Sequence, residues 1–93
     1  MKEQVFVIKN KLGLHAKPSA LFVREAAKFK SSIMVVKEGT EINGKSIMGL
    51  MLLAAENGSK LTVRANGPDE NEALAAIGRL IALKFQVDGN TEE

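Results

Sequence analysis

The sequence predicts an α+β domain in which helices cover one face of a mainly antiparallel sheet. Strand-like and helix-like segments follow one another in the order βαββαβα. Apolar and polar residues alternate through Leu61–Ala65, so one face of that strand, with Thr62 and Arg64, should meet solvent. A length of 93 residues leaves room for one domain. We place it at residues 1–88, with a polar tail at residues 89–93.

The first half of the chain contains three strand signals and one helix signal. Val5–Ile8 is a short β-branched and aromatic run that is typical of a strand. A helical pattern starts at Pro18, because proline is favoured in the first turn of a helix. Its apolar positions are Ala20, Phe22, Val23, Ala26, Ala27 and Phe29. Ile33–Val36 and Thr40–Ile42 are predicted strands joined by a tight turn at Glu38–Gly39.

The second half of the chain contains two helix signals around the alternating strand. Ser46 stands before the apolar segment 47–53, and serine is a preferred helix N-cap. Asp69, followed by Glu72, resembles an Asp-led capping box at the start of the last helix. The apolar stripe of that helix is Leu74, Ile77, Leu80, Ile81 and Phe85. The polar residues 88–93 should fray.

The composition excludes several classes of protein. With no cysteine and one histidine, a disulfide framework, a cysteine zinc site and a histidine-dominated metal site are all excluded. A net charge of +2 and the absence of Trp and Tyr argue against a nucleic-acid module. The apolar runs are far shorter than the roughly 20 residues of a membrane span, and the polar Met1–Gln4 is no signal peptide. A monomeric cytoplasmic protein is therefore expected.

His15 is the residue best suited to chemistry. It stands just before the predicted helix, whose first N–H groups have no partner inside the helix. Helix N-termini attract anions through those donors and through the helix dipole. A phosphate on this imidazole could therefore receive backbone hydrogen bonds. Lys17 and Arg24 follow on the same helix, and either cation could neutralise phosphoryl charge, although solvated surface lysines and arginines are common.

Two short motifs carry a resemblance to a known family. Gly13–Ser19, with the sequence Gly-Leu-His-Ala-Lys-Pro-Ser, is similar to the active-site motif of HPr, the histidine-containing phosphocarrier protein of the bacterial phosphotransferase system. Lys45–Gly49, with the sequence Lys-Ser-Ile-Met-Gly, resembles the regulatory serine motif of that family. The order of the elements also fits. The resemblance therefore covers nearly the whole chain.

The resemblance implies a phosphoryl relay that uses no cofactor. In HPr, enzyme I phosphorylates Nδ1 of the histidine that matches His15, with phosphoenolpyruvate as the original donor. The phosphoryl group then passes to sugar-specific enzyme II A domains or to regulatory proteins. The family fold is an open-faced β-sandwich, in which three helices cover a four-stranded antiparallel sheet. The family usually has Arg in place of Lys17, so this chain keeps the charge but lacks the planar fork that binds two phosphate oxygens.

Ser46 has two compatible interpretations. It can be a plain N-cap, or it can match the serine that HPr kinase/phosphorylase phosphorylates to inhibit the relay. The same serine also occurs in members whose hosts lack that kinase. A short helix cannot bury all of its apolar side chains, so some of the four residues Ile47, Met48, Met51 and Leu52 should be core and others exposed for partner docking. The predicted docking residues are Ala20, Leu21, Arg24, Ile47, Met48, Met51 and Leu52.

Three other functions compete with the phosphotransferase relay. A nucleic-acid module is disfavoured by the composition, as argued above. A small hydrolase is disfavoured because the chain offers no evident pair of nucleophile and base. A regulatory phosphocarrier of a nitrogen-related relay, with no role in sugar transport, is the strongest alternative, because its chemistry at His15 is the same and only its partners differ.

Overall fold

The computed structural model describes residues 1–85 and has the element order that the sequence predicts. Its elements are β1 (Lys2–Val7), α1 (Ala16–Ala26), β2 (Ser32–Lys37), β3 (Thr40–Asn43), α2 (Ile47–Leu52), β4 (Lys60–Asn66) and α3 (Glu70–Ala82). The predicted boundary between a domain ending at residue 88 and a polar tail lies outside the described residues. Among the helices of residues 1–85, none is both long enough and apolar enough to cross a membrane.

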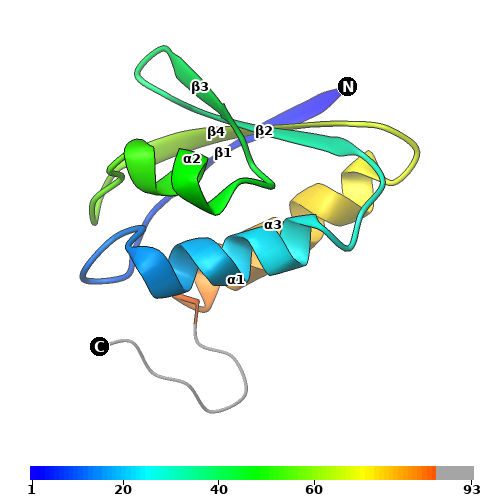
Figure 1. The fold of residues 1–93 in the computed structure, drawn as a ribbon. Helices are drawn as coiled ribbons and strands as arrows, with labels where there is room; N and C mark the ends of the chain where they lie inside the picture. Colours follow the sequence, from blue (N-terminus) through cyan, green and yellow to red (C-terminus); the bar gives the residue numbers. More distant parts are fainter. Residues whose placement is uncertain (86–93) are drawn as a thin grey trace.

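The four strands form one antiparallel sheet in the order β1-β4-β2-β3. Figure 1 shows the three helices on one side of this sheet, which leaves its other face open. The family's open-faced arrangement is thereby confirmed. In the register, Thr62 of β4 lies opposite Val5 of β1 and Val36 of β2. Because side chains alternate along a strand, these three residues share the open face.

The core lies between the sheet and the helices. Leu61, Val63 and Ala65 of β4 are fully buried, as their alternation with polar residues predicts. The buried residues of α3 are Ala73, Leu74, Ile77, Leu80 and Ile81, and Phe85 is buried just beyond it. The predicted stripe of the last helix is therefore confirmed. In α1 the buried apolar residues include Phe22 and Ala26, whereas Ala27 is exposed beyond the end of the helix.

The open face is held by charge pairs as well as by strand pairing. The Arg64 guanidinium contacts Glu3 of β1 at 3.1 Å and Glu41 of β3 at 3.0 Å. Arg64 and Thr62 are half-buried rather than fully solvated. Val5 of β1 is exposed on the same face. The face is therefore accessible, and its one arginine spans three of the four strands.

Two local predictions at helix starts are corrected by the structure. Helix α1 begins at Ala16, two residues before Pro18, because proline fits any position in the first turn, where N–H groups have no partner inside the helix. The Asp-led capping box is wrong. Asp69 is the N-cap of α3 but makes no side-chain capping bond, since its carboxylate faces the turn before β2. Glu70, rather than Glu72, reaches back and accepts a hydrogen bond from Gly67 N–H at 3.1 Å.

Candidate functional site

His15 is the N-cap residue of α1, and its side chain makes no capping hydrogen bond. Its carbonyl accepts the N–H of Ser19 at 3.0 Å, the first intrahelical bond. Pro18 has no N–H, so the N–H groups of Ala16 and Lys17 are the two first-turn donors without a carbonyl acceptor inside the helix. The first turn contains no acidic residue. The imidazole is therefore attached where the helix is most favourable to an anion.

The segment before His15 is clamped against the loop that follows α2. Leu14 N–H donates to the carbonyl of Ala55 at 2.9 Å. Gly13 has φ +71°, and a Cβ at this position would lie 2.2 Å from the same carbonyl oxygen. Only glycine fits here, both for its backbone angle and for the close approach. The glycine of the Gly-Leu-His motif thus sets the distance between the His15 segment and the rest of the domain.

Ser19 is a supporting residue that sequence analysis did not identify. It is fully buried, and its hydroxyl donates to the carbonyl of Leu14 at 3.3 Å. This bond connects the fourth residue of α1 to the residue just before His15. A polar residue at a buried helical position was the available signal, since such a side chain needs a partner.

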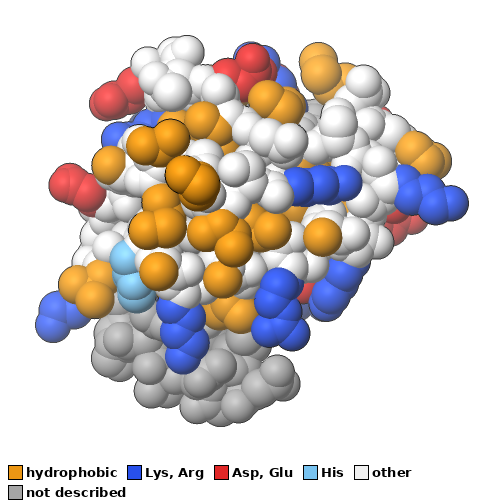
Figure 2. All heavy atoms as spheres, viewed as in Figure 1, with side chains coloured by type: hydrophobic (Ala, Val, Ile, Leu, Met, Phe, Trp, Pro, Cys, Tyr) orange, Lys and Arg blue, Asp and Glu red, His pale blue; other side chains and the backbone are white. Residues whose placement is uncertain are grey.

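The predicted cations lie on the exposed side of α1. Lys17 is exposed in its first turn, and Arg24 is exposed near its last turn. Figure 2 shows the single histidine at the surface, with hydrophobic side chains next to it and Lys or Arg side chains close by. Lys17 is two residues beyond His15 in sequence, and Arg24 is about two helical turns further along. Of the two cations, Lys17 is therefore the nearer to His15 along the chain.

Ser46 is the N-cap of α2, as the sequence predicts. Its Oγ accepts a hydrogen bond from Gly49 N–H at 3.0 Å. The preceding residue, Lys45, donates from Nζ to the carbonyl of Phe29 at 2.8 Å and so connects the start of α2 to the turn after α1. Ser46 is half-buried rather than enclosed. The hydroxyl at which a modification would occur is therefore already hydrogen-bonded to the backbone of α2.

The apolar residues of α2 are more exposed than the sequence predicts. We expected part of the set to be core, but Ile47, Met48, Met51 and Leu52 are all exposed, Met48 at 75% and Leu52 at 79%. The core positions are instead Leu50 and Leu53. Helix α2 has only six residues, so one side chain inside it is enough to fix it to the core.

These exposed residues form one surface with part of α1. Figure 2, viewed as in Figure 1, shows hydrophobic side chains gathered over α2 and the neighbouring edge of α1. On α1, Ala20 and Leu21 are half-buried. We call Ala20, Leu21, Ile47, Met48, Met51 and Leu52 the apolar patch. An exposed apolar area of this kind is typical of a docking surface.

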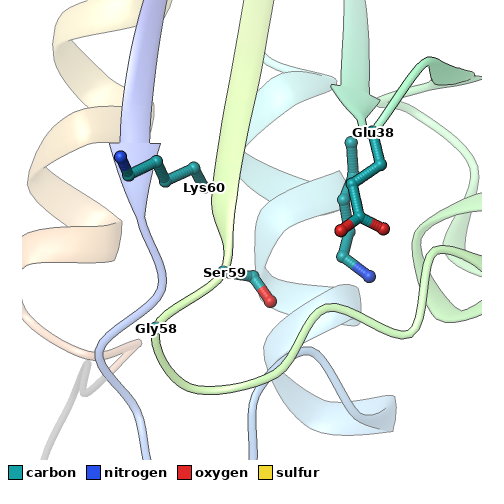
Figure 3. Close-up of a pocket in the computed structure, with 5 residues that line it drawn as sticks. Glu38, Gly58, Ser59 and Lys60 are labelled. Atoms are coloured by element: carbon teal, nitrogen blue, oxygen red, sulfur yellow. The ribbon is translucent and has the colours of Figure 1, made fainter.

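One hollow in the surface, near the ends of β2 and β4, is separate from the candidate site. It has a volume of about 400 Å³ and is lined by Lys37, Glu38, Gly58, Ser59 and Lys60 (Figure 3). None of the predicted site residues lines it. The Lys37 ammonium already donates to the carbonyl of Leu53 at 3.2 Å. Figure 3 shows Lys60 extending away from Glu38, so the charged groups do not converge on a ligand.

The best-defined charged group lies at the start of α3. The Asp69 carboxylate accepts hydrogen bonds from the hydroxyl of Ser31, and from the N–H groups of Lys30 and Ser31 at 2.9 Å each. The Ser31 hydroxyl bond, followed by the Lys30 N–H bond, lowers the pKa of Asp69 from 3.8 to about 2. This network joins two turns and supports the fold. Chemistry is not expected here, because the carboxylate is fully occupied.

The fold and this surface site together define a small α+β domain that presents a histidine at the start of a helix. A family model described as the PTS HPr component phosphorylation site matches residues 2–82. The chain belongs to the HPr family of phosphocarriers of the phosphotransferase system. This identification confirms the family resemblance of the two sequence motifs.

Individual relatives agree with the family model. The phosphocarrier protein HPr of Treponema pallidum is 49% identical over 83% of this chain and 88% of its own. The HPr-like protein Crh of Bacillus subtilis is 44% identical over 87% of this chain and 95% of its own. The crystal structure of an HPr from Thermoanaerobacter tengcongensis matches with a TM-score of 0.89 at 50% identity, over 91% of this chain and 96% of that one. Another crystal structure from that organism is of an HPr dimer.

Proposed function

We propose that this phosphocarrier relays a phosphoryl group through Nδ1 of His15. The group comes from enzyme I, with phosphoenolpyruvate as the original donor, and passes to sugar-specific enzyme II A domains. The observation that carries the proposal is the position of His15, an N-cap whose side chain makes no capping bond, at the start of a helix with no acidic residue in its first turn.

The chemistry follows from this position. The Nδ1 lone pair attacks phosphorus, the bond from phosphorus to the nitrogen or oxygen of the donor breaks, and that donor atom keeps the electron pair. The new phosphoryl group lies near the backbone donors of Ala16 and Lys17 and near the Lys17 ammonium. The helix dipole contributes only about 0.3–1 kcal/mol at an exposed position, which suits a group that must leave again. Onward transfer reverses the same steps with the next acceptor.

Partners dock on the apolar patch, with Arg24 at its side. Methionine side chains adapt their shape to different neighbours, so one patch can serve enzyme I and several acceptors in turn. We further propose that phosphorylation of Ser46, by an HPr kinase/phosphorylase where the host has one, inhibits docking. Two negative charges would then lie directly beside Ile47 and Met48 of the patch. The phosphocarrier acts as a monomer in this proposal, and sedimentation of the purified protein tests that point.

One incubation tests the relay. Enzyme I, radiolabelled phosphoenolpyruvate and the protein are combined, and candidate acceptor domains are then added. The protein should accept a label that is labile in acid and stable in base, as a phosphohistidine is, and should pass it to an enzyme II A domain of a sugar transporter. Absence of label on the protein would refute the relay.

The alternative is a regulatory phosphocarrier of a nitrogen-related relay. The observation that favours a regulatory role is the 44% identity with Crh, which is described as the catabolite repression HPr of Bacillus subtilis. The site chemistry is the same in both cases, so acceptor choice decides between them. Transfer to the acceptor of a nitrogen-related relay, with none to any sugar-specific domain, would establish the alternative.

A further inference from the structure

Sulfur occurs in this chain only in the thioethers of methionine, because the sequence contains four methionines and no cysteine. Two of the four, Met48 and Met51, belong to the apolar patch, where their exposed fractions are 75% and 45%. The other two lie elsewhere. Met1 lies beside α3, since its amino group contacts Glu70 at 3.5 Å, and Met34 is half-buried in β2. The proposed docking surface therefore carries two accessible thioethers.

A thioether is open to a chemistry that no other side chain of the patch offers. A peroxide or a hypohalous acid oxidises methionine to its sulfoxide, and no thiol in this chain competes for the oxidant. With hydrogen peroxide, a sulfur lone pair attacks one oxygen, the S–O bond forms and the O–O bond breaks. The hydroxide that leaves takes the proton of the transferred oxygen and becomes water. Sulfur loses two electrons, and the peroxide gains them.

Oxidation at these two positions would change the patch without disturbing the core. A sulfoxide is polar, whereas the thioether that it replaces is an adaptable apolar group. Helix α2 is fixed to the core by Leu50, and Leu53 is buried just beyond it, so neither methionine is a core residue. The capping bond from Gly49 N–H to Ser46 Oγ involves no methionine side chain. The domain should therefore stay folded while the patch gains two polar groups.

We propose that Met48 and Met51 form a redox-sensitive modification site, at which oxidation by a peroxide or a hypohalous acid weakens partner docking and so slows phosphoryl transfer to His15. The inference rests on the proposed function, because it requires that partners dock on the apolar patch. A partner that covers a sulfoxide removes the hydration of its oxygen and gives no hydrogen bond in exchange. Methionine sulfoxide reductases restore the thioether, so the modification is reversible.

A double variant, Met48→Leu with Met51→Leu, isolates the two methionines of the patch. Leucine is close to methionine in volume but has no sulfur, and Met1 and Met34 remain in this variant. The matched control is Met34→Leu, which makes the same change in the sheet and keeps both methionines of the patch. Each protein is compared with itself before and after treatment with dilute hydrogen peroxide. Differences in starting rate between the variants therefore do not affect the comparison.

Transfer from phosphorylated enzyme I is measured before and after oxidation, and peptide mapping locates the added oxygen atoms. In the parent protein and in Met34→Leu, oxidation should raise KM about tenfold, the effect of burying a polar group without a partner, and should leave kcat nearly unchanged. The two sulfoxide reductases, one for each epimer, should restore the starting KM. The double variant should keep its KM, although Met1 in it is as exposed as Met48 in the parent, at 75%.

Several results would overturn the proposal. One is an unchanged KM in a parent protein whose Met48 and Met51 both carry oxygen. Another is an equal rise of KM in the double variant, or a rise that the reductases do not reverse, because another group would then be responsible. A large loss of melting temperature on oxidation would show unfolding instead of weakened docking. If the untreated parent accepts no phosphoryl group, the relay itself fails, and calorimetric titration of enzyme I with treated and untreated protein still decides whether oxidation weakens docking.

Discussion

The starts of α1 and α2 use their N-cap residues in opposite ways. The side chain of Ser46 caps its own helix, because its Oγ accepts a hydrogen bond from the N–H of Gly49 at 3.0 Å. His15 occupies the same position in α1, but its side chain makes no capping bond to its own helix. Removing the Ser46 side chain should therefore affect stability, whereas removing the ring of His15 should affect function alone. The N-cap residue thus supports the fold in α2 and, in the proposed function, carries the reaction in α1.

The start of α3 shows a third use of an N-cap. The Asp69 carboxylate bonds to Ser31 and Lys30, which lie far away in sequence, and leaves its own helix uncapped. The lowered pKa of Asp69 is a sign of those bonds. The side chain here connects two turns, and its effect should be seen in the stability of the whole domain.

The largest expected effect is that of His15→Ala. This variant should accept no phosphoryl label from enzyme I, because it lacks the nucleophile. Its melting temperature should stay close to that of the parent, since no capping bond is lost. Labelling and thermal unfolding, measured on the same preparation, check both halves. Acid-labile label on the variant would show that the phosphorylated residue is not His15.

Lys17→Glu should give the next largest effect and separates function from stability. A negative charge beside a phosphoryl group should reduce transfer on the order of 100-fold, comparable to the loss of one transition-state donor. The same charge lies at a helix N-terminus, where it is favourable, so the melting temperature should hold or rise. Lys17→Arg should transfer at least as well as the parent, because a guanidinium binds two oxygens at once. Equal rates in all three proteins would make Lys17 a bystander.

The Asp69 network predicts how stability depends on acid. The folded-state pKa of about 2 lies below the value of 3.8 for a free carboxyl. The contribution of Asp69 is therefore complete above about pH 4 and is lost as the pH falls from 4 towards 2. The hydrogen bond from Gly67 N–H also lowers the pKa of Glu70 and adds to the same trend. Denaturant unfolding across this range should show that Asp69→Asn is less stable at neutral pH and less sensitive to acid; parallel pH profiles would contradict this.

Substitutions at Ser46 should change stability only modestly. Ser46→Ala should lower the free energy of unfolding by about 1 kcal/mol, the usual effect of losing a capping bond. Ser46→Asp should keep most of the stability, because aspartate caps helices as well as serine does. It should nevertheless accept phosphate from enzyme I more slowly, through its charge next to the apolar patch. Unfolding of Ser46→Asp together with normal transfer would reverse the interpretation of this residue.

Much of the fold could be predicted because local patterns and tertiary structure agree. The alternation of Leu61, Val63 and Ala65 predicted a half-buried strand, and Ser46 predicted a helix start that the structure confirms. The family resemblance supplied what these patterns could not, the phosphocarrier function of the family. The roles of His15, Lys17 and Ser46 in transfer and regulation stay predictions.

The failures occurred where a side chain bonds to a distant segment. Asp69 precedes a helix with an acidic first turn, which predicts a capping box, yet Ser31 and Lys30 offer it three donors instead. The position of these donors depends on how the sheet brings two turns together. No local sequence pattern contains that information. The supporting role of Ser19 was missed for a related reason, because a buried polar residue is recognised only when the core is known.

The open face of the sheet has a practical consequence. The chain contains no cysteine, so one introduced thiol would be the only one in the protein. Thr62 lies on that face, on the side of the sheet away from α1 and α2. A Thr62→Cys variant coupled to a sensor surface would therefore present His15 and the apolar patch outward in every molecule. Binding assays on such a surface would compare partners on a uniformly oriented layer, a condition that random coupling through lysines cannot provide.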